Sequence, residues 1–165
     1  MSALELVFGR ILADEGGIAT LNDGAGETRF GQTAAWLATF NLPTPQTAAD
    51  ALQNYLTWAH LTGLDQIVGE PFDLLGWAVV DWSVNSGHRL AVQALQRRLS
   101  VTADGIVGPQ TIAELAISNR QRLAAELIAD HVRFYGHLDQ QNGGTFAESW
   151  NNRIAEQIDY LGGLI

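Results

Sequence analysis

Residues 14–33 read DEGGIATLNDGAGETRFGQT, and this stretch decides how the first part of the chain folds. The segment before it, residues 2–13, has apolar side chains spaced for one face of an α-helix. Ser2 and Glu5 stand three residues apart, as in a capping box at a helix start. Gly16-Gly17 then ends the helix, because glycine readily adopts the left-handed conformation that closes a last turn. The predicted apolar stripe consists of Leu4, Val7, Phe8, Ile11 and Leu12.

Glu15 lies at the end of this predicted helix and projects from its apolar stripe, four residues after Ile11 and three after Leu12. Burial removes hydration from the carboxylate, and the helix C-terminus presents the negative end of its dipole. Both effects favour the protonated form, which a general acid requires. A solvated glutamate beside a glycine cap is equally compatible with this spacing, and for an arbitrary helix it is the commoner case.

The rest of the stretch predicts a β-hairpin, because an Asn-Asp-Gly turn signal separates two short runs of strand-forming residues. We expect strands at residues 18–21 and 28–30, folded back over the end of the first helix. Asp23 and Thr28 would then lie near Glu15. A glutamate, an aspartate and a threonine in one cleft suit hydrolysis of a glycosidic bond. One carboxyl protonates the leaving oxygen while the other groups hold the attacking water.

These residues carry a resemblance to a known enzyme family. Glu15-Gly16-Gly17, followed by the segment 23–31, resembles the signature of the glycoside hydrolase family 108 N-acetylmuramidases, roughly E-G-G-Y and then D-P-G-G-x-T-x-x-G-I. The order of Glu, Asp and Thr is also similar to the catalytic set of phage-type lysozymes. The chain departs from the signature at Ile18, which replaces tyrosine, at Gly24-Ala25, which replaces Pro-Gly, and at Gln32, which replaces an apolar residue.

The resemblance extends over nearly the whole chain. Residues 81–87, DWSVNSG, resemble the family's D-x-x-V-N-x-G segment. Residues 104–111, DGIVGPQT, resemble the D-G-x-x-G-x-x-T turn of peptidoglycan-binding modules, although such a loop can serve packing alone. Near the end, the family's pattern of an aromatic residue and a tryptophan followed by arginine fits Phe146, Trp150 and Arg153.

Five further residues are candidates for contact with the sugar chain. Tyr55 and Trp58 echo a Y-W pair of the family, and aromatic faces stack well on sugar rings, although aromatics at helical spacing are more often core residues. Asp81 and Asn85 share one face of a predicted helix. They form either a wall of the sugar cleft or a buried polar pair. Glu27, in the hairpin, is a further acidic candidate.

The composition is that of a globular protein, with 165 residues, 47% hydrophobic and 16% charged. A net charge of −9, from eighteen acidic residues and nine basic ones that are all arginine, argues against nucleic acid or an anionic membrane as a partner. There is no cysteine, and the four histidines form no metal-binding motif, so we expect no disulfide, metal or cofactor. His131 stands on the apolar side of its helix, which favours a core histidine. The N-terminus shows no secretory signal, and no apolar run approaches the length of a membrane span.

The apolar spacing predicts a mainly α fold of seven or eight helices with a small β-hairpin near the N-terminus, and the resemblance implies that it is a single lysozyme-like domain. Residues 1–87 hold the catalytic motifs, and residues 88–165 form a peptidoglycan-binding-like helical region. Because no linker separates the two regions, we expect them to pack into one body. Beyond the first helix, we expect helices at 33–40, 48–60, 72–86, 88–99, from Pro109 onward, at 119–138 and at 146–161.

The resemblance implies an N-acetylmuramidase, a lysozyme-type phage endolysin or a prophage-derived secretion or lysis factor. It would cleave the β-1,4 bond between N-acetylmuramic acid and N-acetylglucosamine in bacterial peptidoglycan. Glu15 would be the general acid, and Asp23 and Thr28 would hold water or stabilise developing positive charge. Water held between them favours inversion, whereas a close approach of Glu15 and Asp23 allows retention.

The same resemblance implies a monomer that is made in the bacterial or host cytoplasm. It would reach the cell wall through a separate pore or export route. Two other classes stay open at this point. One is a wall-binding or secretion and lysis accessory protein without catalysis. The other is a lytic transglycosylase, in which a hydroxyl of the sugar itself attacks.

Overall fold

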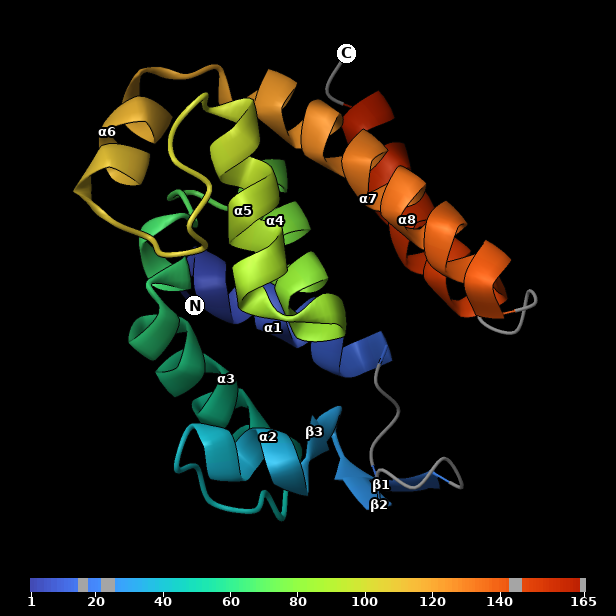
Figure 1. Ribbon diagram of the computed structural model, residues 1–165. Helices are drawn as coiled ribbons and strands as arrows, with labels where there is room; N and C mark the ends of the chain where they lie inside the picture. Colours follow the sequence, from blue (N-terminus) through green and yellow to red (C-terminus); the bar gives the residue numbers. More distant parts are fainter. Residues whose placement is uncertain (15–17, 22–25, 143–146, 164–165) are drawn as a thin grey trace.

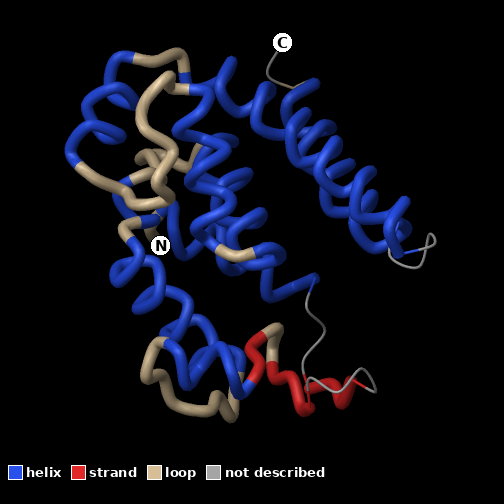
Figure 2. The backbone as a smooth tube through the Cα atoms, viewed as in Figure 1, coloured by secondary structure: helices blue, strands red, loops and turns tan. Residues whose placement is uncertain are grey.

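The computed structural model describes residues 1–14, 18–21, 26–142 and 147–163. Within these ranges the chain forms eight α-helices, one short 3-10 helix and a small antiparallel sheet of three strands (Figures 1 and 2). The predicted mainly α fold with a small N-terminal sheet is confirmed. The elements are α1 (Ala3–Asp14), β1 (Ile18–Leu21), β2 (Gly26–Arg29), β3 (Gln32–Thr33), α2 (Ala34–Thr39), α3 (Ala48–Thr62), the 3-10 helix η1 (Leu64–Gln66), α4 (Leu74–Ser86), α5 (His88–Arg98), α6 (Pro109–Ile117), α7 (Arg120–Asn142) and α8 (Ala147–Gly162).

Helix α1 begins with the predicted capping box. The Ser2 backbone N–H donates to the Glu5 carboxylate at 2.6 Å, and the Glu5 N–H donates to the Ser2 hydroxyl at 3.2 Å. These bonds satisfy two of the backbone donors that a helix start leaves unpaired. The predicted apolar stripe is also confirmed, since Val7, Phe8 and Ile11 are buried and the other two members pack against the same core.

The sheet has the strand order β1-β2-β3, with both pairs antiparallel. The predicted hairpin is confirmed, but its second strand begins at Gly26 and ends at Arg29. Phe30, which we predicted to lie in that strand, forms with Gly31 a two-residue turn in which both φ angles are positive, 52° and 77°. Such a turn matches the twist of a hairpin and lets the chain add the unpredicted third strand, in which Gln32 pairs with Arg29.

Two threonines begin the next helices. The Thr33 hydroxyl accepts the Trp36 N–H at 3.2 Å at the start of α2, as predicted. Thr47 caps α3 and forms a complete capping box with Asp50. Figure 1 shows the sheet next to α2, beyond the C-terminal end of α1. The sheet is therefore held from the α2–α3 side of the molecule.

Helix α4 is the central helix of the fold. All ten residues from Leu74 to Ser83 are buried, and α4 packs against α1, α5, α7 and α8. A helix that is apolar nearly all round belongs in such a place, as the sequence predicted. The predicted start of this helix at Phe72 was wrong. The Asp73 carboxylate accepts the Gly76 N–H at 2.6 Å and caps the helix, so α4 begins at Leu74 and Phe72 precedes it.

The C-terminal helices α7 and α8 pack side by side, and both contact α4 (Figure 1). Ile154 on α8 is buried as predicted, but Ile158 is 49% exposed, which corrects the predicted inner face of this helix. The next residue on the buried face of α8 after Ile154 is Gln157, three positions later, which is fully buried. One further residue turns Ile158 about 100° around the helix axis and toward solvent. The side chains of the predicted closing pattern, Phe146, Trp150 and Arg153, lie outside the described part of the chain.

One hydrophobic cluster runs through the molecule from Val7 on α1 to Ile154 on α8. It takes buried side chains from α3 and α4 as well as from α5 and α7. Residues of both predicted regions, 1–87 and 88–165, therefore share core contacts. In the part of the chain that the structure covers, the helices are all too short or too polar to cross a lipid bilayer.

Candidate functional site

Two of the three predicted catalytic residues, Glu15 and Asp23, lie outside the described residues. Glu15 follows directly on the last residue of α1, and Asp23 falls between β1 and β2 in the chain. The third, Thr28, lies on the central strand β2 of the sheet. Glu27 precedes it on the same strand and pairs with Thr20 of β1. The described frame of the candidate site is therefore the end of α1 and the sheet.

Thr28 has a hydroxyl with unused hydrogen-bonding capacity. Its partners across the sheet are Ala19 on β1 and Thr33 on β3. The Thr28 side-chain oxygen is shielded from solvent but forms no hydrogen bond with the described protein atoms. A buried polar group left unpaired costs about 1–3 kcal/mol, so such groups need an explanation. A hydrogen bond from the Thr28 hydroxyl to a bound water or substrate would provide this explanation.

A buried amide pair fixes the sheet to α3. The Gln32 side chain is 1% exposed, and its Nε2 donates to the Ala51 carbonyl at 2.8 Å. Asn54 Nδ2 donates to Gln32 Oε1 and to the Pro43 carbonyl, each at 2.8 Å. Sequence reasoning recorded Gln32 only as a departure from an apolar position and missed Asn54. The available signal was a polar residue at each of two otherwise apolar positions.

The structure places Tyr55 and Trp58 in the core, which is the alternative that the sequence left open. Each is 1% exposed, so neither ring offers a face to a sugar. The Tyr55 ring stacks on Phe8 with centroids 5.1 Å apart, and its hydroxyl donates to the Phe30 carbonyl at 3.2 Å. Tyr55 therefore supports the turn that follows Thr28. The assignment of Tyr55 and Trp58 as substrate-binding residues stays a prediction, and the burial of both rings favours the core alternative.

Asp81 and Asn85 come together as their spacing predicted. Asn85 Nδ2 donates to the Asp81 backbone carbonyl at 2.8 Å and approaches its carboxylate at 3.4 Å. Asp81 is 2% exposed in the middle of α4, whereas Asn85 is exposed near the helix end. The pair therefore reaches from the core to the surface.

The turn at residues 104–111 is held together by a buried side chain of α5. Gln96 Nε2 donates to Asp104 Oδ1 at 2.8 Å, to the Ile106 carbonyl at 2.9 Å and to the Thr111 hydroxyl at 3.1 Å. Gln96 Oε1 accepts the Gly105 N–H at 2.8 Å. The pKa of the Asp104 carboxyl is lowered, chiefly because the Ile106 N–H donates to it. Sequence reasoning missed Gln96, and the contacts give this motif a packing role.

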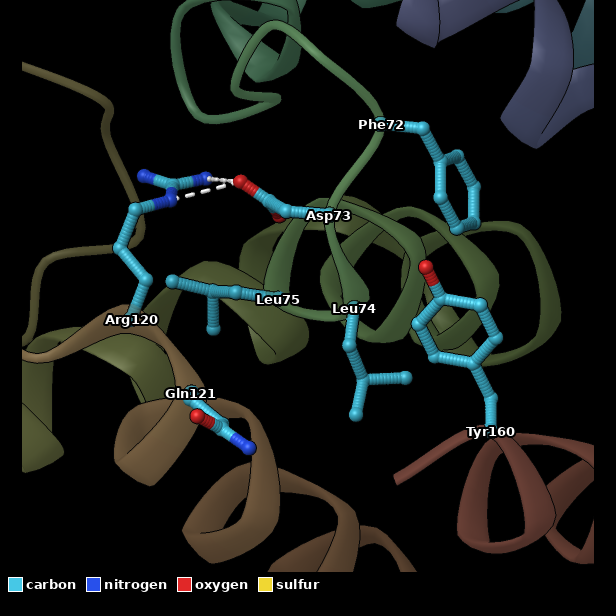
Figure 3. Close-up of a pocket in the computed structure, with 7 residues that line it drawn as sticks. All are labelled: Phe72, Asp73, Leu74, Leu75, Arg120, Gln121 and Tyr160. Carbon is cyan, nitrogen blue, oxygen red and sulfur yellow. Dashed lines mark hydrogen bonds and ion pairs between the residues drawn. The ribbon is translucent and has the colours of Figure 1, made fainter. Parts of the chain in front are cut away.

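A cavity of about 260 Å³ lies where α4, α7 and α8 meet (Figure 3). On one side, the Arg120 guanidinium binds the Asp73 carboxylate at 2.5–2.6 Å and the Ile67 carbonyl at 2.7 Å. On the other side, the rings of Phe72 and Tyr160 meet edge to face with centroids 5.6 Å apart. The Arg120–Asp73 ion pair at its rim joins α7 to the start of α4, which gives this side of the cavity a structural role.

A larger groove of about 500 Å³ lies between α5 and α7, and sequence reasoning did not find it. We call it the α5–α7 groove. Its lining combines aromatic, aliphatic and cationic side chains from three helices. They are Trp82 of α4, Leu90, Ala94, Arg97 and Arg98 of α5, and Asp130, Arg133, Phe134 and His137 of α7.

His131 is a core residue, as predicted. It is 1% exposed and stacks on Trp82 with ring centroids 4.4 Å apart. Burial lowers the pKa of His131 to about 3, so the imidazole is neutral at physiological pH. Its Nε2 atom forms no hydrogen bond with the described residues. No group of three or more His, Asp or Glu side chains that could hold a metal ion occurs in the described ranges.

Comparison with known proteins connects the chain to the bacterial cell wall. Residues 90–155 match the family model described as "Predicted Peptidoglycan domain". This is a peptidoglycan-associated protein. Among solved structures, "Structure of Brucella abortus SagA" is similar in fold, with a TM-score of 0.75 and 22% sequence identity over 97% of this chain and 94% of that chain. No curated protein matches the sequence.

Proposed function

We propose that this protein is an N-acetylmuramidase that hydrolyses the β-1,4 bond between N-acetylmuramic acid and N-acetylglucosamine. The observation that carries the proposal is the Thr28 hydroxyl, which is buried without a hydrogen-bond partner on the described chain. It stands in the Glu15, Asp23, Thr28 order that resembles the muramidase catalytic set. The peptidoglycan family match at residues 90–155 supplies the substrate class.

In the proposed reaction, Glu15 donates its proton to the glycosidic oxygen as the bond to the sugar carbon breaks. A water molecule attacks that carbon from the opposite face and passes a proton to the Asp23 carboxylate. The Thr28 hydroxyl accepts a hydrogen bond from this water or donates one to it, which orients the attack. This division of work is that of an inverting glycosidase.

The contacts around the sheet support this role for Thr28, because a catalytic group has to be held in a fixed position. Gln32 and Asn54 bind the third strand to α3, and Tyr55 binds the turn between β2 and β3. Asp81 and Asn85 would position the cleft or the substrate without proton transfer. The setting that we propose is lysis or secretion, with access to the wall through a separate pore or export route.

Two rival functions make different products. A wall-binding accessory protein, an alternative that the departures at Ile18 and Gly24-Ala25 keep open, releases nothing from peptidoglycan. A lytic transglycosylase leaves anhydro-muramic ends, because a hydroxyl of the sugar replaces water. A muramidase leaves reducing muramic ends.

Digestion of purified peptidoglycan followed by separation of the fragments tests the proposal. We expect reducing muramic ends with the wild-type protein. Glu15→Gln should lose about 10²–10⁴-fold in rate because glutamine has no proton to donate. Glu156→Gln, an exposed change of the same kind on α8, is the matched control and should keep wild-type activity. Turnover by folded Glu15→Gln within threefold of wild type would overturn the assignment.

A further inference from the structure

The α5–α7 groove concentrates positive charge in an acidic molecule. The chain has a net charge of −9, yet Arg97, Arg98 and Arg133, three of its nine basic residues, line this one groove. The first two come from the last turn of α5, and the third comes from the middle of α7. Residues far apart in the sequence thus bring their guanidinium groups to one cavity of about 500 Å³.

The cationic charge of the groove is only partly neutralised. Asp130 is the one acidic residue among its described lining residues. Its carboxylate accepts bonds from Arg98 Nε at 2.7 Å and Nη2 at 2.5 Å, and from Arg133 Nη1 at 2.9 Å. Arg97 forms no hydrogen bond or ion pair with the described residues. Arg98 also forms an ion pair with the Glu126 carboxylate at 3.9 Å, and Glu126 is shared with Arg122 outside the groove. Three guanidinium groups therefore face two carboxylates, which still leaves an excess of positive charge for an anionic ligand.

The rest of the lining favours an anion with apolar parts. Leu90 and Phe134 are half-buried, and Ala94 is buried beside them. Trp82, which is 2% exposed, closes the inner side. Arginine recognises carboxylates through paired N–H groups, and apolar surface favours short aliphatic side chains. The groove therefore suits a short peptide that carries free carboxylates and methyl groups.

The position of the groove points to the polymer that supplies such a ligand. Apart from Trp82, all its lining residues fall within 90–155, the range that matches the predicted peptidoglycan domain. Peptidoglycan consists of amino-sugar chains that bear short, alanine-rich peptides with free carboxylates. We infer that the α5–α7 groove binds the carboxylate-bearing peptide stem of peptidoglycan, an inference that rests on peptidoglycan being the substrate in the proposed function.

A binding experiment on the full chain tests this inference without any hydrolysis. The probe is the disaccharide-tetrapeptide released from purified peptidoglycan, which has no muramidase-sensitive bond left. Its partner is the same disaccharide after enzymatic removal of the peptide. Calorimetric titration should show binding of the peptide-bearing form about tenfold or more tighter, and the difference should shrink as salt rises.

Variants locate the binding in the groove. Arg97→Gln removes a charge that makes no ion pair within the described chain and should weaken binding of the peptide-bearing probe about 3- to 10-fold. Arg133→Gln should weaken it by a similar factor. Arg89→Gln is the matched control, because it removes an exposed arginine from helix α5 that lies outside the groove and donates to the Asp104 carbonyl. Its affinity should stay within twofold of wild type, and thermal melts check that all three variants fold.

Three results would overturn the inference: equal affinity for the two disaccharides, wild-type affinity in folded Arg97→Gln and Arg133→Gln, or tighter binding of a glycerol-phosphate oligomer than of the peptide-bearing probe. The last result would assign the groove to a wall phosphate. Hydrolysis of peptidoglycan is measured separately on the same preparations. Hydrolysis without binding of the peptide stem would contradict only the inference about the α5–α7 groove. Binding of the stem without hydrolysis would contradict only the muramidase proposal.

Discussion

Two regions of this protein each present a motif threonine beside a buried amide, and the two threonines differ. In the turn at 104–111, Gln96 donates to the Thr111 hydroxyl at 3.1 Å, so that motif is satisfied internally. At the sheet, the Gln32 amide donates to a backbone carbonyl of α3 and the Asn54 amide donates to the Pro43 carbonyl. The Thr28 hydroxyl has no hydrogen-bond partner among the described residues. The difference distinguishes the two threonines: the Thr111 hydroxyl is engaged within the fold, whereas the Thr28 hydroxyl keeps its hydrogen-bonding capacity for a ligand.

The largest effect is expected when the C-terminal region of the chain is removed. Truncation after Leu99 removes α6, α7 and α8, and with them Leu127, Ile128 and Ile154 of the shared core. We expect an insoluble or molten fragment, because the apolar faces of α4 and α5 lose their partners. Circular dichroism and hydrolysis assays on the fragment check this. A folded, active fragment would show that residues 1–99 form a domain of their own.

The next largest effect concerns the turn at residues 104–111, whose hydrogen bonds Gln96 makes. Gln96→Leu keeps much of the side-chain volume but removes four hydrogen bonds, including the one from the buried Gly105 N–H. We expect a loss of about 3 kcal/mol in the free energy of unfolding, because buried polar partners are left unsatisfied. Urea titration measures it. The activity per folded molecule should stay near wild type. A change below 0.5 kcal/mol would mean that Gln96 does not hold the turn, since surface substitutions already reach about that size.

A smaller effect concerns His131, whose folded-state pKa of about 3 lies below the usual value of 6.5. Because the unfolded chain takes up the proton first, stability is full above pH 6.5 and falls as the pH drops toward 3. The loss should reach about 2 kcal/mol by pH 5. His131→Phe should flatten this part of the stability profile. His88, whose pKa burial also lowers, leaves a residual slope.

Urea titrations at pH 7, 6 and 5 on wild type, His131→Phe and the exposed control His60→Gln resolve the contribution. The lowered pKa values of Asp50, Asp104 and Asp130 start from 3.8, so their losses come at lower pH. An unchanged slope in His131→Phe between pH 6.5 and pH 5 contradicts the assignment.

Local signals predicted most of the fold. The Ser2–Glu5 capping box, the Thr47 cap and Pro109 at the start of α6 depend on neighbours within a few residues, and the structure has all three. Periodic apolar spacing likewise predicted α1, and α4 apart from its first residues. The misplacement of Ile158 arose because the same spacing fits two neighbouring faces of α8, and only packing on α4 and α7 decides between them.

The candidate site could be predicted only in part, because its contacts join distant residues. Glutamines such as Gln32 and Gln96 look like surface residues until the partners Asn54 and Thr111 are known. Helical spacing describes Tyr55 equally well as a core residue and as a sugar platform. The α5–α7 groove depends on which faces of two separate helices meet, and no local pattern encodes that.

The central claim is that Thr28 serves the substrate while Thr111 serves the fold, and one paired measurement tests it. Thr28→Val and Thr111→Val are nearly isosteric, and each is assayed for kcat/KM on purified peptidoglycan and for the free energy of unfolding. We expect Thr28→Val to lose about 10- to 100-fold in kcat/KM, the cost of one transition-state hydrogen bond, with stability within about 1 kcal/mol of wild type. Thr111→Val should lose about 1–2 kcal/mol of stability and keep its activity per folded molecule. Wild-type kcat/KM in Thr28→Val, or its loss in a fully folded Thr111→Val, would contradict the account.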